Sequence, residues 1–195
     1  MREYTIVHRQ TQHCWDNVPT LYVDNQQWVD PLPIKMQAQI CYDDEAMYLR
    51  MQVVEPNIRA EETGPLGSPF KDSCMEFFFC PTDLDDRYFN FEFNLNLCLV
   101  MRLNRGAAGS IRMVPNIALL NASAQRTEDG WILEYQIPHA LIQQFYPEFK
   151  PASGGHIRAN VYKCGHETVH PHYHTWNYVD LPKPSFHCPE FFGMM

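Results

Sequence analysis

The sequence predicts an all-β protein: an antiparallel β-sandwich of the jelly-roll or immunoglobulin-like type, with one short helix. Three observations support this. Apolar and polar residues alternate with a period of two in several short segments, Gly, Pro and Asp turns separate those segments, and only one segment has a helical pattern. In residues 88–97, every second residue is Phe or Leu. Because successive side chains of a strand point to opposite faces, we expect these rings on the buried face of a central strand.

The other elements follow from the same signals. The dipeptide Asp129-Gly130 is a strong hairpin signal, and Pro138 stands at the start of the one helical segment, residues 139–145. The expected strands are residues 37–42, 47–53, 73–80, 88–97, 98–103, 117–124, 131–137 and 156–164.

Size and charge limit the classes of protein and partner. The 195 residues, 45% of them hydrophobic, suit one domain with its own core, and no linker or repeat divides residues 1–195. The net charge is −8, and Lys and Arg form no basic stripe, so we expect no nucleic acid partner. No apolar run approaches the roughly 20 residues that span a bilayer, so we expect no membrane partner.

The cysteines indicate a reducing environment. They are seven in number, they form no C-x-x-C pair, and several lie inside apolar strand patterns. Free, buried thiols explain this pattern better than a disulfide framework. The first ten residues have charged and polar side chains where a secretory signal has an apolar run. We therefore expect a cytoplasmic protein, or an extracellular one if a leader has been removed.

Five segments carry a pattern that is specific through its order: LYVDNQQW (residues 21–28), AQICYDDEAMYLRMQVVEP (38–56), DSCMEFF (72–78), DGWILEYQIP (129–138) and FHCPEFFG (186–193). Together they resemble the family 9 carbohydrate-binding modules, in particular the branch called family 9-like. The resemblance implies a DOMON-like β-sandwich. It also implies a non-catalytic function, the binding of a mono- or oligosaccharide, as in the modules attached to xylanases.

The resemblance also implies which residues contact the sugar. In these modules two tryptophans clamp a sugar ring, and the two positions fall here on Phe70 and Phe186. The acidic residue of the DSVE-type strand falls on Glu76, and the family's arginine and asparagine fall on Glu92 and Asn94. Phenylalanine offers less stacking area than tryptophan, and glutamate accepts hydrogen bonds where arginine donates them.

The alternation itself predicts a polar face beside these residues. If the phenylalanines of residues 88–97 point into the core, Glu92 and three asparagines share the opposite face, and the same parity places Arg158 and Asn160 on such a face. Asparagine is a poor strand former, so three in one strand suggest a use, although a solvated outer face would give the same pattern. Trp176, in a loop-rich stretch, completes the candidate set. Packing in the core is the alternative for the tryptophans, and packing at the sandwich edge for the two phenylalanines.

Two segments are candidates for a metal, although we expect no cofactor. Alternate histidines in an extended segment can bind zinc or copper, and the first candidate is therefore the cluster of His166, His170, His172 and His174. The second candidate is the acidic loop with Asp83, Asp85 and Asp86, because such a loop can hold a structural calcium ion, as modules of the resembling family can. Polar loops and acidic turns without a metal are the ordinary alternatives.

Other function classes are less well supported. The motifs G-x-S-x-G, H-E-x-x-H and the P-loop are missing, so we expect no enzyme. Glu76 and Glu92 on neighbouring strands leave a glycosidase as an alternative. A second class is a haem-binding electron-transfer domain, because relatives of this sandwich hold haem through Met, His or Lys, and the chain has nine Met and nine His. A third is an interaction domain with a vestigial sugar site.

Overall fold

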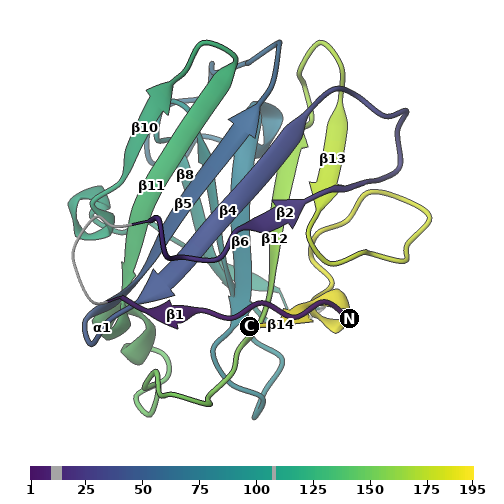
Figure 1. Cartoon of the computed structure of the whole chain (residues 1–195). Coiled ribbons are helices and arrows are strands. Elements are labelled where there is room, and N and C mark those ends of the chain that lie inside the picture. Colours follow the sequence, from purple (N-terminus) through teal and green to yellow (C-terminus); the bar gives the residue numbers. More distant parts are fainter. Residues whose placement is uncertain (10–14, 107–108) are drawn as a thin grey trace.

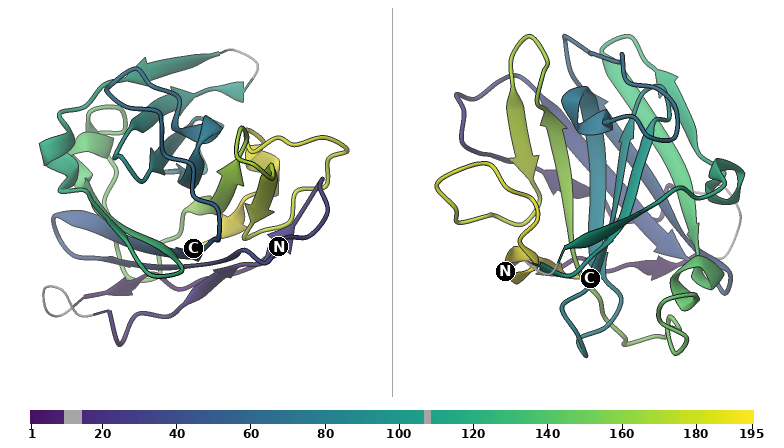
Figure 2. Two further views of the ribbon diagram at one scale, coloured as in Figure 1. Left: turned by 90° about the horizontal axis from the view of Figure 1, so that it is seen from above. Right: turned by 180° about the vertical axis from the view of Figure 1, so that it is seen from behind.

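The computed structural model of the chain describes residues 1–9, 15–106 and 109–195. Two β-sheets pack face to face, and the view from above shows them as two layers around a common interior (Figures 1 and 2). Within the described residues the named strands pair antiparallel, except that β1 (Val7–His8) pairs parallel with β4 (Lys35–Tyr42). The predicted antiparallel β-sandwich is therefore confirmed. In the same residues no helix is both long and apolar enough to cross a membrane.

The first sheet has six strands in the described residues, in the order β1-β4-β5-β11-β10, with β2 also pairing with β4. Strands β5 and β11 pair along their whole lengths. The first residue of β11 has to be glycine, Gly130, because a Cβ there would lie 1.8 Å from the carbonyl oxygen of Val53. The remaining strands of this sheet are β2 (Leu21–Val23), β5 (Ala46–Val54), β10 (Ser123–Arg126) and β11 (Gly130–Pro138).

The second sheet has eight described strands in the order β3-β13-β12-β6-β7-β8-β9, with β14 also pairing with β12. Both chain ends lie at one end of the sandwich, where Glu3 bridges Met194 (Figure 1). The strands are β3 (Asn25–Gln26), β6 (Ser73–Cys80), β7 (Tyr88–Asn94), β8 (Leu99–Asn104), β9 (Ser110–Met113), β12 (Arg158–Gly165), β13 (His172–Thr175) and β14 (Gly193–Met194).

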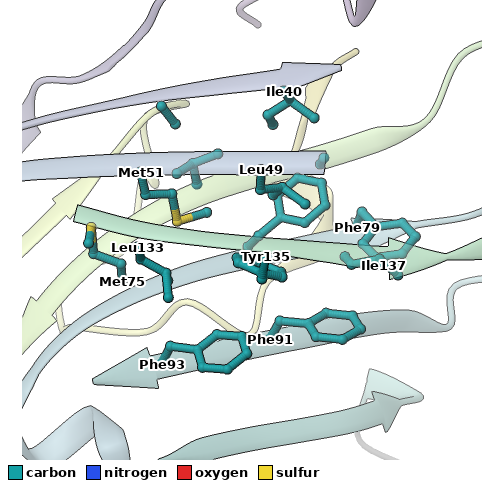
Figure 3. Close-up of a cluster of buried hydrophobic side chains, with 14 of the residues drawn as sticks. Ile40, Leu49, Met51, Met75, Phe79, Phe91, Phe93, Leu133, Tyr135 and Ile137 are labelled. Atoms are coloured by element: carbon teal, nitrogen blue, oxygen red, sulfur yellow. The ribbon is translucent and has the colours of Figure 1, made fainter. Parts of the chain in front are cut away.

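The core lies between the sheets, as the alternation predicts. The phenylalanines of β7 face inward, and Phe91 is only 1% exposed. The ring of Phe93 lies 4.8 Å from that of Tyr135 on β11, centroid to centroid. Figure 3 shows these rings between side chains of both sheets, including Leu49 and Met51 of β5. The buried face of β7 is confirmed.

The strand expected over residues 117–124 is wrong. The Asn116 side chain accepts a hydrogen bond from the Ala118 amide and starts a 3₁₀ helix, η3 (Ile117–Leu120). Asn121 then has a φ of 44°, in the left-handed region, which turns the chain before β10 begins. The local hydrogen bond of Asn116 and the left-handed turn at Asn121 thus override a run of β-compatible residues.

Several other boundaries differ from expectation by one to three residues. Strand β7 ends at Asn94 rather than Leu97, because the Asn94 Oδ1 atom accepts hydrogen bonds from the amides of Asn96 and Cys98 and closes a turn. The helix α1 (His139–Gln143) is two residues shorter than the expected 139–145. Two other 3₁₀ helices within the described residues are η1 (Pro69–Lys71) and η4 (Pro189–Phe191).

The outer face of the second sheet is covered over β6, β7 and β12. Phe78, Tyr88 and Tyr162 are buried there beneath the carboxyl-terminal segment, which contributes Phe186 and Phe192 to a second apolar cluster. The alternative interpretation, in which the polar face of these three strands is exposed to solvent, is therefore wrong. The six described cysteines are free and buried, and Cys14 lies outside the described residues.

Candidate functional site

A cleft of about 340 Å³ opens beside this covering segment. It lies over the second sheet, with walls from η1, β13 and the loop before η4 and a floor from β6, β7, β8 and β12. It is lined by Phe70, Glu76, Glu92, Arg102, Cys164, His166, Tyr173, Pro184, Ser185, Phe186 and His187.

Aromatic rings form one wall of the cleft. Phe186 stacks on Tyr162 with centroids 4.1 Å apart and planes 9° apart, so Tyr162 fixes its orientation from the buried side. Tyr173 of β13 and Trp28 lie 6.3 and 6.1 Å from the Phe186 ring. Phe70 comes from η1, where Pro69 begins the turn, and is 36% exposed. The wall therefore offers one exposed ring and one held in place by packing.

Two carboxyl groups form the floor. Glu76 on β6 and Glu92 on β7 are paired in register, and both are buried. The Cys164 thiol donates a hydrogen bond to Glu76 Oε1, with 3.0 Å between the sulfur and the oxygen. Glu92 accepts from the Asn90 amide, and Asn90 Oδ1 in turn accepts from Asn104 at 2.6 Å. Each carboxyl group of the floor thus has its own buried hydrogen-bond partner.

The environment of these carboxyl groups favours their protonated forms. Burial, and secondly the neighbouring Cys164, raises the pKa of Glu76 well above its usual value. Burial, and secondly Glu76, raises the pKa of Glu92 in the same way, while Arg102 lowers it. Because a protonated carboxyl group has both a donor O–H and an acceptor C=O, the pair offers both kinds of hydrogen bond to a ligand.

Arg102 in the floor and His187 in the loop before η4 add further polar atoms to the cleft. The Nε atom of Arg102 is buried and has no hydrogen-bond partner. The Nδ1 atom of His187 lies 2.9 Å from the Tyr88 hydroxyl oxygen. Burial, and secondly the Arg102 charge, lowers the pKa of His187, which keeps its ring neutral. Arg102 is thus a cation with an unused donor near Glu92.

Four of the eight residues expected at a sugar site line this cleft: Phe70, Phe186, Glu76 and Glu92. The structure does not bring the other four to it. Asn94 uses its amide on Asp72 Oδ2 and the Glu62 carbonyl oxygen, at 2.7 and 2.8 Å, and holds the turn after β7.

The remaining three have structural contacts elsewhere. Asn160 is buried and bonds the backbone of Asn177 through both ends of its amide group. Arg158 pairs with Asp83 and donates to the Pro189 carbonyl oxygen. Trp176 lies in the core, 4% exposed.

Several lining residues were not expected from the sequence. Arg102 on β8 and Cys164 on β12 lie on the strand faces opposite the core, so the alternation of those strands carried a signal for both. Tyr173 lies in β13, a strand for which the sequence has only alternate histidines as a sign, and His166 directly follows β12. The Nδ1 atom of His166 lies 2.7 Å from the Tyr173 hydroxyl oxygen.

Neither expected metal segment assembles a donor group in the described residues. His172 and His174 are buried, whereas His166 lies at the cleft. In the acidic loop, Asp83 pairs with His156 and Arg158, and Asp85 pairs with Arg87. These ion pairs occupy the carboxylates that a calcium ion would need.

The sequence model of one family, carbohydrate-binding family 9, matches residues 11–195. No curated protein matches the chain. Among solved structures, a Bacteroides uniformis protein proposed to be carbohydrate-binding is similar with a TM-score of 0.80 and 26% identity, over 91% of this chain and 85% of that chain.

Two structures of a carbohydrate-binding module of family 9 from Caldicellulosiruptor kristjanssonii share the fold. The complex with cellotriose has a TM-score of 0.69 and 13% identity, over 99% of this chain and 92% of that chain. The complex with glucose has a TM-score of 0.66 and 13% identity, over 98% and 91% of the two chains.

Proposed function

This chain belongs to carbohydrate-binding family 9, and we propose that it binds a mono- or oligosaccharide, without transforming it, in the cleft between Phe70 and Phe186. The observation that carries the proposal is the meeting of both aromatic positions with both buried glutamates in one cleft. Three of these residues come from η1, β6 and β7, and Phe186 comes from a loop near the far end of the sequence.

The chemistry of the cleft suits a sugar ring. A sugar presents apolar C–H faces and a rim of hydroxyl groups, so it needs an aromatic surface with donors and acceptors beside it. Phe70 and Phe186 provide the surface. Glu76 and Glu92 accept or share hydrogen bonds, and Arg102 donates where the family's arginine has been replaced by Glu92.

The geometry favours binding over hydrolysis. A glycosidase needs two carboxyl groups that flank the scissile bond from opposite sides. Glu76 and Glu92 lie side by side on paired strands of one sheet, so both contact a ligand from the same side. We therefore propose a binding module rather than an enzyme.

Glucose and short β-linked glucose oligomers are the first ligands to test, because the structural neighbours hold glucose and cellotriose. A volume of about 340 Å³ lies at the lower end of the range for ligand pockets, which suits one or two sugar rings. Phenylalanine stacks less area than tryptophan, so we expect a dissociation constant on the order of 10⁻⁴ M or weaker.

Calorimetric titration with glucose and cellotriose tests the proposal through Phe70→Ala. The loss of one stacking ring, about 1.4 kcal/mol, should weaken binding about tenfold. Because Phe70 is 36% exposed, the variant should stay folded. The matched control is Tyr22→Ala, an exposed aromatic on β2 of the other sheet, which should bind like the wild type.

Arg102→Met gives an independent second arm. This substitution keeps an apolar side chain in the cleft and removes the guanidinium donors. It should therefore also weaken sugar binding, although Phe70 is still present. Sugar affinities that are equal in the wild type, Phe70→Ala and Arg102→Met would contradict this site. A protein that binds no sugar at millimolar concentration would contradict the proposed function itself.

A further inference from the structure

Two thiols and a carboxyl group meet beneath the cleft. Cys74 and Glu76 lie on the same face of β6, and Cys164 lies directly opposite Cys74 on β12. One donor atom from each of the three lies within 4.8 Å of the other two, and all three residues are buried. Among the described residues this is the one group of three or more His, Cys, Asp or Glu with such spacing.

We propose that Cys74, Glu76 and Cys164 form a binding site for a zinc ion, with a fourth coordination position open to the cleft. Zinc takes thiolate sulfur at about 2.3 Å and carboxylate oxygen at about 2.0–2.2 Å in a tetrahedron. Two sulfurs on one zinc ion therefore lie about 3.8 Å apart, a separation that the cluster reaches with small shifts.

The donor set selects the class of metal. Two sulfur ligands favour a soft or borderline cation such as zinc over calcium or magnesium, which require oxygen ligands. The backbone here is held by the β6–β12 ladder on both sides of the cluster, so the positions of the three donors are fixed by the fold. A preformed site on rigid strands binds a metal without ordering a loop.

An ion can reach the site from solvent, and its charge can be balanced by loss of protons from the donors. Glu76 and Cys164 line the cleft, so an ion can enter from solvent, and a water molecule can complete its coordination. Burial raises the pKa of Cys74 and of Glu76, so in the metal-free protein these two donors keep their protons. Zinc replaces up to three protons, which leave to the solvent, and no atom is oxidised or reduced.

The test uses Zn²⁺ alone, added to the full-length, metal-free protein kept reduced by a phosphine. We expect one equivalent to bind, with release of protons measured by calorimetry in two buffers of different ionisation enthalpy. Co²⁺ in place of Zn²⁺ should give a sulfur-to-metal charge-transfer band and the visible absorption of a tetrahedral site.

Variants assign the site. Cys74→Ser and Cys164→Ser should each lose more than about 100-fold in affinity, because even outer-shell changes cost 10–100-fold. Cys80→Ser is the matched control, since Cys80 lies on the same strand and face, is buried, and is outside the cluster. Thermal unfolding of all variants in the presence of a chelator shows that each is folded before metal is added.

Three results would overturn the inference. The first is the absence of Zn²⁺ binding in the reduced wild type, and the second is unchanged binding in both cluster variants. The third is a protein mass lower by two hydrogen atoms, with peptide mapping that assigns the loss to a disulfide between Cys74 and Cys164. The outcome is independent of the proposed function, because the metal measurements contain no sugar.

Discussion

Individual side chains decide how the covered face of the second sheet is used. Glu92 and the asparagines alternate with the phenylalanines, and sequence parity places them opposite the core. Parity does not say what covers them. Glu92 and Asn94 are two residues apart and lie on the same face of β7. Yet the Asn94 side chain is used for hydrogen bonds within a turn, whereas Glu92 lines the cleft. Such differences depend on contacts with distant segments, so they could not be predicted from the strand alone.

His174 on β13 predicts a loss of stability in acid. Burial, followed by the charge of Lys163, lowers the pKa of this imidazole from 6.5 to about 3. The unfolded chain binds a proton below about pH 6.5 and the folded chain does not. The stability that the neutral ring supports is therefore present above pH 6.5 and declines as the pH falls towards 3, by up to about 1.4 kcal/mol per pH unit.

Urea unfolding of the wild type and of His174→Phe, between pH 7 and pH 4, measures this effect. The variant keeps a buried ring and loses the titration, so its free energy of unfolding should fall less steeply with decreasing pH. Glu76 and Glu92, whose raised pKa values act in the opposite direction, are present in both proteins and cancel in the comparison. Parallel curves would show that His174 is not held neutral by burial.

Among the elements, those with strict alternation were predicted best. Strands β5, β6 and β11 lie within one residue of the predicted bounds, and β7 begins where predicted, because one face of each meets the core. The prediction for segment 117–124 failed because the Asn116 side chain bonds the Ala118 amide and Asn121 adopts a left-handed φ. Strand β13 was missed because its alternate residues are histidines, which a hydrophobic pattern does not count as buried.

Phe91→Ala tests the central role of β7. The ring is 1% exposed and lies between the sheets, so its removal leaves a cavity and should lower the free energy of unfolding by about 3–5 kcal/mol. Denaturant titration measures the change. Phe70→Ala, at the exposed rim, should lie within about 1 kcal/mol of the wild type. A change below about 1 kcal/mol for Phe91→Ala would contradict the position assigned to this strand.

The whole molecule is a sandwich with a third partial layer, and that layer makes the site. The carboxyl-terminal segment packs on Phe78, Tyr88 and Tyr162, and the cleft remains where η1 and β13 meet its edge. The resemblance in the sequence identified four of the lining residues. It could not identify Arg102, because this residue reaches the cleft from a strand that carries no family position.

A crystal structure of the protein soaked with cellotriose tests the account most directly. We expect one glucose unit in the cleft, stacked on Phe70 and Phe186, with its hydroxyl groups bonded to Glu76, Glu92 or Arg102. A sugar bound at another surface while this cleft holds only water would contradict the account.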